Sequence, residues 1–174
     1  MIDTPPEVKL VPELDSDRSA EAFLSIADRL SDERYWQLLR WVWIKHGGSI
    51  SRLKAQEKLL LCPRPKREFL MLPEESAAFA ALADEVEAFH GTSMNAKEFG
   101  WSWALKFHSS YSFASKRYAD GPKVMRGLCK KQDIIAYFPS YDENEIVINP
   151  VNASVIEELV KDALFEARNK YKFD

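Results

Sequence analysis

The stretch EAFHGTSMNAKEFGWSWAL, residues 87–105, decides the fold, because the sequence pattern changes here from helical to strand-like. EVEAFHG at 85–91 alternates apolar and polar residues, as a half-buried strand does. This strand ends in His90, Gly91 and Thr92, and a glycine at that point would let a ligand approach the backbone closely. The pattern predicts a strand with a candidate binding motif at its end. A surface or capping histidine is the alternative interpretation.

A second strand is predicted within the same stretch, and it carries Ser102 and Trp103. The chain has five tryptophans and ten phenylalanines in 174 residues, which predicts an aromatic core or an aromatic pocket. This strand therefore has two interpretations. In the first, Ser102 belongs to a binding site; in the second, the tryptophans pack in the core and the serine has no role.

The segment upstream of these strands is predicted to be helical from residue 16 to residue 84. Apolar residues recur at helical spacing through 16–46, where Ser31 is placed to cap the second of two helices. A short third helix ends in the proline-containing sequence CPRP, and a fourth begins at Pro73, a residue suited to a first helical turn. The acidic, proline-bearing residues 1–15 are expected to form a flexible arm.

The segment downstream is predicted to be rich in strands. A helix that carries Tyr111 comes first, and a final helix is expected in 151–174. The strand-like runs between them are 123–130, 132–138 and 143–149. Because the helices come first and the strands later, the chain is predicted to be α+β rather than alternating βαβ. A single domain over 16–174 with a β-rich core at 85–150 is the expected organisation.

Composition narrows the classes of function. The net charge of −3 lacks the basic footprint of a general nucleic-acid binder. Cys62 and Cys129 are far apart and form no CxxC pattern, so two reduced thiols are expected rather than a disulfide framework or a zinc site. No apolar run approaches the roughly 20 residues of a membrane span, and the N-terminus is no signal peptide. A cytoplasmic protein without a membrane partner is expected.

The strongest local signal for chemistry is YDENEIVINP at 141–150, where Glu143 and Glu145 are separated by one residue. Side chains two apart on a strand point to the same face, so these carboxylates would form a pair at the mouth of a strand. Such a pair can face a developing positive charge. Because two carboxylates side by side repel each other, a solvent-exposed strand edge is the alternative explanation.

The order of these pieces resembles the ADP-ribosyltransferase fold. The four pieces are Phe89-His90-Gly91, Ser102-Trp103-Ala104, Phe113-Ala114-x-x-Arg117 and Tyr141-x-Glu143-x-Glu145-Ile146. They are similar to YRG, SWT, FA.R and R.E.EI of bacterial and phage members, over roughly residues 67–150. His90 stands where that group has arginine, and its His-Gly-Thr is similar to the first motif of the poly(ADP-ribose) polymerase branch. Ala104 and Tyr141 are two further departures.

The resemblance implies a split β-sandwich that uses NAD as co-substrate. Family members cleave the bond between nicotinamide and ribose, which leaves an oxocarbenium-like ribose as in glycoside hydrolysis. By resemblance, Glu145 stabilises that charge by holding a ribose hydroxyl. Glu143 would orient or deprotonate the acceptor. No metal is required.

The resemblance also implies contacts to NAD. The candidate NAD-binding residues are His90, Gly91, Thr92, Ser102, Trp103 and Arg117. His90 would donate a hydrogen bond to, or accept one from, the adenosine ribose or a phosphate. Ser102 would position Glu145, and Trp103 would flank the nicotinamide ring. The strands are expected to bring His90, Ser102 and Glu145 to one cleft.

Two parts of the ligand need further residues. The pyrophosphate needs cationic or backbone N–H donors, for which Arg117 and Lys106 are the candidates. The polymerase branch would also require a stacking tyrosine, and Tyr111 is the candidate.

The function implied is a mono-ADP-ribosyltransferase that transfers ADP-ribose from NAD to a macromolecular acceptor, first of all the arginine side chain of a protein. A nucleic-acid acceptor is less favoured, because an acidic chain repels phosphates. Three alternatives remain open. They are an NAD glycohydrolase, an inactive ADP-ribosyltransferase-like module that binds a partner through its Trp-rich helices, and a plain structural or interaction protein whose motifs are core and surface residues.

Overall fold

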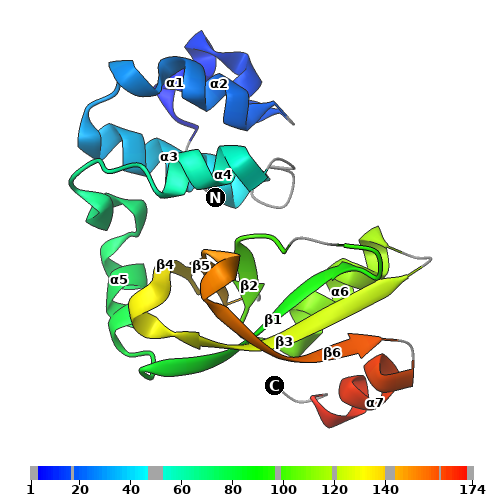
Figure 1. Cartoon of the computed structure of the whole chain (residues 1–174). Coiled ribbons are helices and arrows are strands. Elements are labelled where there is room, and N and C mark those ends of the chain that lie inside the picture. The colour runs from blue at the N-terminus through cyan, green and yellow to red at the C-terminus, as the bar shows by residue number, and fades with distance from the viewer. Residues whose placement is uncertain are drawn as a thin grey trace. The chain divides into compact units, whose positions relative to one another are not determined.

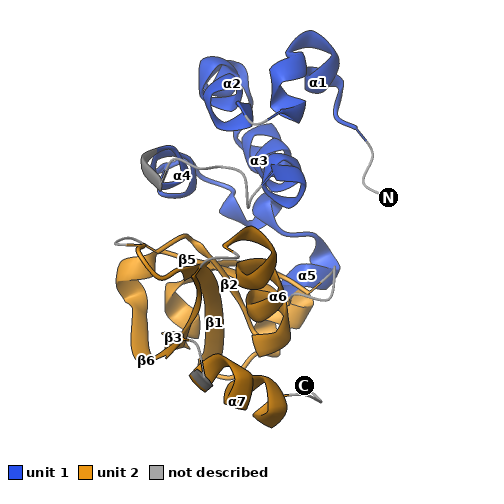
Figure 2. Ribbon diagram, turned by 90° about the vertical axis from the view of Figure 1, so that its right-hand side faces the viewer, with its two compact units in different colours: residues 1–76 blue, residues 77–174 orange. Residues whose placement is uncertain are grey.

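The computed structural model divides into two compact units, residues 1–76 and 77–174 (Figure 2). The residues that it describes are 4–16, 18–46, 53–96, 99–118, 121–139, 144–160 and 162–171. A single domain over 16–174 was expected, with its β-rich part beginning at 85. The first strand does begin at Glu85, and the two units are described separately below.

The first unit consists of helices, as the apolar spacing predicts for residues 16 onward (Figure 1). They are α1 (Pro6–Leu10), α2 (Ser19–Ile26), α3 (Asp32–His46) and α4 (Leu53–Leu60), followed by α5 (Pro73–Ala80), which runs past the end of this unit. The Ser31 hydroxyl accepts the backbone N–H of Arg34 at 3.3 Å, which confirms Ser31 as the cap of α3. The tryptophans of α3, Trp36, Trp41 and Trp43, are all buried.

Residues 1–15 differ from the flexible arm that their composition predicts. Residues 6–10 form α1, and 12–15 form a 3₁₀ turn whose Leu14 is fully buried. The Glu7 carboxylate accepts hydrogen bonds from two nitrogens of the Arg34 guanidinium, and this contact lowers the pKa of Glu7. One buried leucine and one bidentate ion pair therefore attach this segment to the helices.

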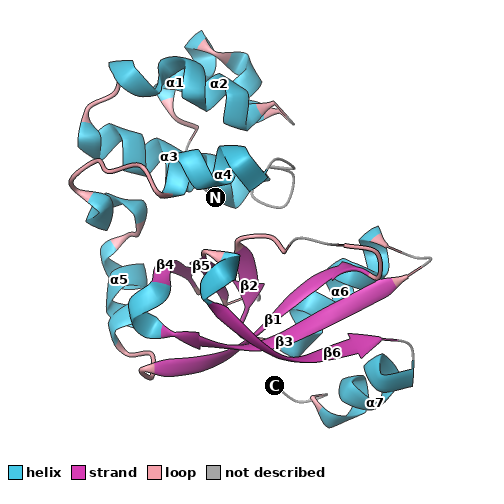
Figure 3. Ribbon diagram, viewed as in Figure 1, coloured by secondary structure: helices cyan, strands magenta, loops and turns pink. Residues whose placement is uncertain are grey.

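The second unit is built on a six-stranded antiparallel sheet in the order β4-β5-β2-β1-β3-β6 (Figure 3). The strands are β1 (Glu85–Ser93), β2 (Ser102–Ala104), β3 (Pro122–Lys130), β4 (Ile134–Phe138), β5 (Glu145–Ile148) and β6 (Ala153–Val160). Two helices accompany them, α6 (Phe107–Arg117) and α7 (Asp162–Lys170). The α+β class is confirmed.

The sheet is split between β1 and β2. Strand β1 pairs with β3 along its whole length, but it pairs with β2 only through Phe89 and Ala104. Three strands, β4, β5 and β2, thus form one half, and β1, β3 and β6 form the other. Trp103 of β2 reaches past β1, because its Cζ3 atom lies 3.2 Å from where a Cβ on Gly127 of β3 would be. Trp103 is fully buried where the halves meet.

Strand β6 corrects the expectation of one helix through 151–174. Residues 153–160 pair antiparallel with β3, and the α-helix α7 covers 162–170. The β-branched residues Val155, Ile156 and Val160 suit a strand. Pairing with β3 also gives that strand its second neighbour and buries Leu159. Tertiary pairing here outweighs an apolar spacing that also fits a helix.

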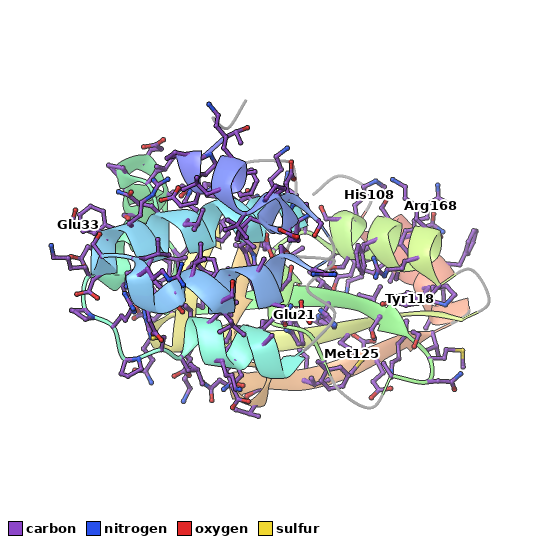
Figure 4. All side chains as sticks on the ribbon, turned by 90° about the horizontal axis from the view of Figure 1, so that it is seen from above. Glu21, Glu33, His108, Tyr118, Met125 and Arg168 are labelled. Carbon is purple, nitrogen blue, oxygen red and sulfur yellow. The ribbon has the colours of Figure 1, made fainter. Side chains whose placement is uncertain are left out.

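Helices α6 and α7 cover one face of the β1–β3–β6 half. Their shared core consists of Phe89, Phe107, Ala114, Val124, Leu159, Leu164 and Ala167. The Phe107 ring stacks between Tyr111 and Tyr171, with centroid distances of 5.8 and 5.1 Å. Figure 4 labels His108 on α6 and Arg168 on α7, and the Arg168 guanidinium lies 5.9 Å from the Tyr111 ring centroid.

Candidate functional site

Ser102 and Glu145 lie on one face of neighbouring strands. In the β2–β5 pair, Ser102 is opposite Val147 and Ala104 is opposite Glu145. Opposed residues of an antiparallel pair share a face, and residues two apart on a strand do so as well. Ser102 and Glu145 are thus diagonal neighbours, a relation in which residues are about 7 Å apart and within reach of a long side chain. Both are partly accessible to solvent.

Glu145 is the first residue of β5, and its carboxylate therefore lies at the start of a strand, as the sequence predicts. Asn144 before it has a φ of 45°, a conformation that asparagine tolerates better than most residues. The Asn144 carbonyl accepts the N–H of Leu105 at 3.0 Å, which ties the start of β5 to the end of β2. Glu143, the other member of the expected pair, lies outside the described residues.

His90 uses both ring nitrogens within the protein. Its Nδ1 lies 2.8 Å from the Ser102 carbonyl oxygen, and its Nε2 lies 3.2 Å from the Gly100 backbone nitrogen. A carbonyl oxygen only accepts, so Nδ1 carries the proton, and Nε2 accepts the Gly100 N–H. The ring is therefore the neutral Nδ1–H tautomer. In this conformation it has no nitrogen left for a ribose hydroxyl or a phosphate, in contrast to the expected role.

Burial lowers the pKa of His90, and the hydrogen bond to the Ser102 carbonyl opposes this effect only partly. The imidazole lies 5.3 Å from the Trp103 ring at an interplanar angle of 31°, and 6.3 Å from the Phe99 ring. Removal of the ring from water disfavours the imidazolium, and this desolvation is the largest cause of the lowered pKa. The electrostatics and the hydrogen-bond geometry thus agree on a neutral ring.

Gly91 makes room for α6 rather than for a ligand. A Cβ at this position would lie 2.3 Å from the backbone oxygen of Ser110, so only glycine allows α6 to approach β1 this closely. The Ser110 hydroxyl donates to the Phe89 carbonyl at 2.7 Å and fixes that approach. Thr92 is 5% exposed and lies opposite Lys123 of β3. Both members of the motif are buried between secondary-structure elements.

Trp103 differs from the expected nicotinamide-flanking residue because it is 0% exposed. Its indole Nε1–H donates to the Gly100 carbonyl at 3.1 Å, so its polar atom is also satisfied within the fold. The interpretation of the tryptophan as a core residue describes this side chain correctly.

The two cationic candidates lie at opposite ends of α6. Lys106 immediately precedes the helix, two residues after Ala104, the partner of Glu145. Arg117 is the last residue of the helix, and its guanidinium lies 5.8 Å from the Phe113 ring centroid. Eleven helical residues correspond to about 16 Å, so Lys106 is the cation placed near Glu145. The Tyr111 ring is stacked on Phe107 and contacted by the Arg168 guanidinium. The tyrosine expected to stack on the ligand therefore already packs within the protein.

The expected cleft therefore separates into two groups of residues. His90 and Trp103 project from one face at the β1–β2 junction. Phe89 is opposite Ala104, and Ala104 is opposite Glu145, so Phe89 shares a face with Glu145, and His90, the next residue, projects from the other. The structure brings Ser102 together with Glu145, and it brings His90 to the backbone of Ser102. The side chains of His90 and Glu145 do not share a face.

Two residues of the site were missed by the sequence argument. Gly100 donates its N–H to His90, and a Cβ on it would lie 3.1 Å from the His90 Cε1 atom. Phe99 contributes the second ring beside the imidazole. The sequence does carry one signal, a glycine between two aromatic residues in FGW, but nothing local indicates that it faces His90.

Several other properties bear on the choice of chemistry. Within the described parts of the chain, no three His, Cys, Asp or Glu side chains are grouped as a metal ion would require. Cys62 and Cys129 are free thiols, and burial raises the pKa of Cys129 to about 11. Among the described helices, none has both the length and the apolar character needed to cross a membrane. No protein-family model, no curated protein and no solved structure matches the chain.

Proposed function

We propose that the chain is a cytoplasmic, NAD-consuming mono-ADP-ribosyltransferase with a split β-sandwich core. One observation carries the proposal. Ser102 and Glu145 are diagonal neighbours on one face of β2 and β5, beside the place where the sheet splits. The four sequence pieces that resemble the ADP-ribosyltransferase fold support it, and so does the single backbone pairing between the two halves of the sheet.

In the proposed reaction, the bond between the ribose C1′ and the nicotinamide nitrogen breaks, and its electron pair leaves with neutral nicotinamide. The ribose then carries an oxocarbenium-like positive charge. Glu145 stabilises this charge, which develops only in the transition state. Ser102, the diagonal neighbour of Glu145, would donate a hydroxyl hydrogen bond to the Glu145 carboxylate and so orient it. Lys106, before the first turn of α6, is the cation best placed for the pyrophosphate.

The acceptor attacks C1′ and loses a proton as the new bond forms. Glu143 is the proposed base, and an arginine side chain of a protein is the proposed acceptor. With water as acceptor, the same site would act as an NAD glycohydrolase. A nucleic-acid acceptor is less favoured, because the net charge of the chain is −3.

The test is nicotinamide release from NAD by the full chain and by Glu145→Gln, which keeps the shape of the side chain and removes its charge. We expect a loss of about a hundredfold or more, on the scale of a lost electrostatic contact in a transition state. Glu85→Gln is the matched control, because Glu85 is likewise the first residue of a strand and its side chain is exposed. Activity of Glu145→Gln within threefold of wild type would refute the assignment. Labelled NAD with a cell lysate separates transfer from hydrolysis.

A module without turnover is the second candidate, and the His90–Trp103 group favours it. Both nitrogens of His90 are bonded within the protein and Trp103 is buried, so neither is available to a ligand in this conformation. Such a module would not bind a partner through the tryptophans of α3, because these are buried as well. It predicts no nicotinamide release from wild type, and unchanged binding of a partner by Glu145→Gln.

A further inference from the structure

Strand β2 lacks most of the backbone partners that β1 would supply in a continuous sheet. Toward β5, the ladder is intact: the N–H of Ile148 donates to the Trp101 carbonyl at 2.9 Å, and the N–H of Leu105 donates to Asn144 at 3.0 Å. Residues of an antiparallel strand direct their backbone groups alternately to the two sides. The backbone groups of Gly100 and Ser102 are therefore directed away from β5, toward β1.

Strand β1 leaves before it can meet these groups. Phe89 pairs with Ala104, so in a continuous ladder Gly91 would pair with Ser102, and Ser93 with Gly100. Gly91 instead approaches α6, where a Cβ on it would lie 2.3 Å from the Ser110 carbonyl oxygen. The N–H and C=O groups of Gly100 and Ser102 would thus be left without a strand partner.

The imidazole of His90 supplies two of the missing bonds, and the Trp103 indole N–H supplies a third to the Gly100 carbonyl at 3.1 Å. Nδ1–H donates to the Ser102 carbonyl at 2.8 Å, and Nε2 accepts the Gly100 N–H at 3.2 Å. One ring replaces an acceptor and a donor of the absent backbone, which only the neutral tautomer can do. Trp103 holds the ring from one side at a centroid distance of 5.3 Å, and Gly100 has no Cβ to displace it.

We propose that His90 is a positioning residue that replaces the β1 ladder at the split, and so holds Ser102 in register with Glu145. Its hydrogen bonds reach the backbone of Ser102 from the face opposite to Glu145. His90 therefore contacts no substrate. The consequence for catalysis rests on the proposed function, whereas the hydrogen-bond arrangement does not.

The first measurement is the tautomer of His90 in the full chain, from ¹⁵N NMR of the imidazole nitrogens at pH 7. The chain has three histidines, and His108→Phe assigns an exposed one. We expect the Nδ1–H tautomer for His90, with chemical shifts that stay unchanged when NAD is added. An Nε2–H tautomer, an imidazolium at pH 7 or a shift on addition of NAD would overturn the proposal. This measurement needs no activity, and the one substitution that it uses replaces an exposed side chain.

The second measurement uses His90→Phe, which keeps a ring beside Trp103 and removes both hydrogen bonds. Amide exchange at Gly100 should become about tenfold faster, because its acceptor is lost. The kcat for nicotinamide release should fall about tenfold or more, since small displacements of a catalytic group are costly. KM for NAD should stay within about threefold. His90→Asn keeps a donor near the Nδ1 position and should recover part of kcat.

The outcomes separate the two proposals. A wild-type protein without nicotinamide release contradicts the proposed function, while the tautomer and the Gly100 exchange still decide the role of His90. A raised KM with an unchanged kcat in His90→Phe would mean a ligand contact and would overturn the positioning role. His108→Phe, on the exposed side of α6, should leave kcat, KM and Gly100 exchange unchanged.

Discussion

Strand β1 has two neighbours, and it is joined to them in different ways. With β3 it forms a complete backbone ladder, from Glu85 opposite Lys130 to Ser93 opposite Pro122. With β2 it shares one backbone pair, and a histidine side chain supplies the next two hydrogen bonds. The β1–β3 junction depends on backbone hydrogen bonds, which nearly any sequence can form. The β1–β2 junction depends on the identity of a few residues.

This difference explains why sequence motifs concentrate at the β1–β2 junction. His90, Gly91, Gly100 and Trp103 each make a contact there that depends on the type of residue. Such a pattern is also what a ligand-binding motif would produce. At this junction, motif-like spacing therefore reflects the way in which a split sheet is held together.

The largest effect is expected where β1 leaves β2. Gly91→Ala places a Cβ 2.3 Å from a backbone oxygen of α6, and a helix backbone cannot move aside as a side chain can. None of the described glycines has a positive φ, so the cost is steric rather than conformational. We expect a loss of about 3 kcal/mol in the free energy of unfolding. Urea denaturation followed by circular dichroism measures it.

Gly121→Ala is the matched control for that substitution. Its Cβ would lie 3.4 Å from Met94 side-chain atoms, an ordinary contact. We expect the free energy of unfolding to change by less than about 1 kcal/mol, with a gain possible from the smaller entropy of the unfolded chain. Equal losses in both variants would contradict the close approach of α6 to Gly91.

A smaller effect is expected from Gly100→Ala, which tests the His90 arrangement without changing the histidine. The new Cβ would lie 3.1 Å from the His90 Cε1 atom, and the ring would have to shift by a few tenths of an ångström beside Trp103. We expect a loss of about 1 kcal/mol in unfolding free energy, typical of mild overpacking, together with a changed near-UV signal of the tryptophans. A silent substitution would mean that the imidazole is loosely held.

Much of the fold follows from local pattern. The helices α2 to α5 and the strands β1, β3, β4 and β5 agree with the prediction within a few residues, because their apolar periodicity is clear. Strand β6 was not, because Ile156, Leu159 and Val160 fit both a helix and a strand. Only pairing with β3 decides between them, and that pairing is non-local. The prediction of a flexible arm at residues 1–15 was wrong for a similar reason, because the structure of this segment depends on a contact with Arg34, which is distant in the sequence.

The candidate site was predictable only in part. Strand geometry places Glu145 at the mouth of β5, and this much follows from the sequence. The diagonal relation of Ser102 to Glu145 depends on the register of β2 with β5, which two short strands do not encode locally. The role of His90 depends on the residue at which the β1–β2 ladder ends. A motif specifies residue types, but the register specifies what they face.

An effect smaller than that of Gly100→Ala is expected at the junction of β1 with β3. Arg126 of β3 contacts the carboxylates of Glu87 in β1 and Glu157 in β6, all of them partly exposed. Arg126→Met should lower the free energy of unfolding by less than about 1 kcal/mol, because surface ion pairs contribute little and the backbone ladder remains. A loss larger than that of His90→Phe would reverse the comparison, since side chains would then matter more at the β1–β3 junction. Urea midpoints of the two variants decide it.

The smallest effect is the pH dependence that His90 adds to stability. Burial lowers the pKa of His90 in the folded protein, against about 6.5 in an unfolded chain. As pH falls through that value, the unfolded chain takes up a proton at His90 while the folded ring stays neutral. The unfolded state then binds more protons, so the free energy of unfolding decreases as pH falls. His90→Phe lacks this group, whereas His46 and His108 are present in both proteins and cancel in the comparison. The stability difference between wild type and His90→Phe should therefore shrink from pH 7.5 to pH 5.5 in urea denaturation.

A difference that stays constant would mean that His90 titrates in the folded state as it does in the unfolded chain. The junction would then tolerate an imidazolium that cannot accept the Gly100 N–H, and the arrangement at the split would not depend on the neutral ring.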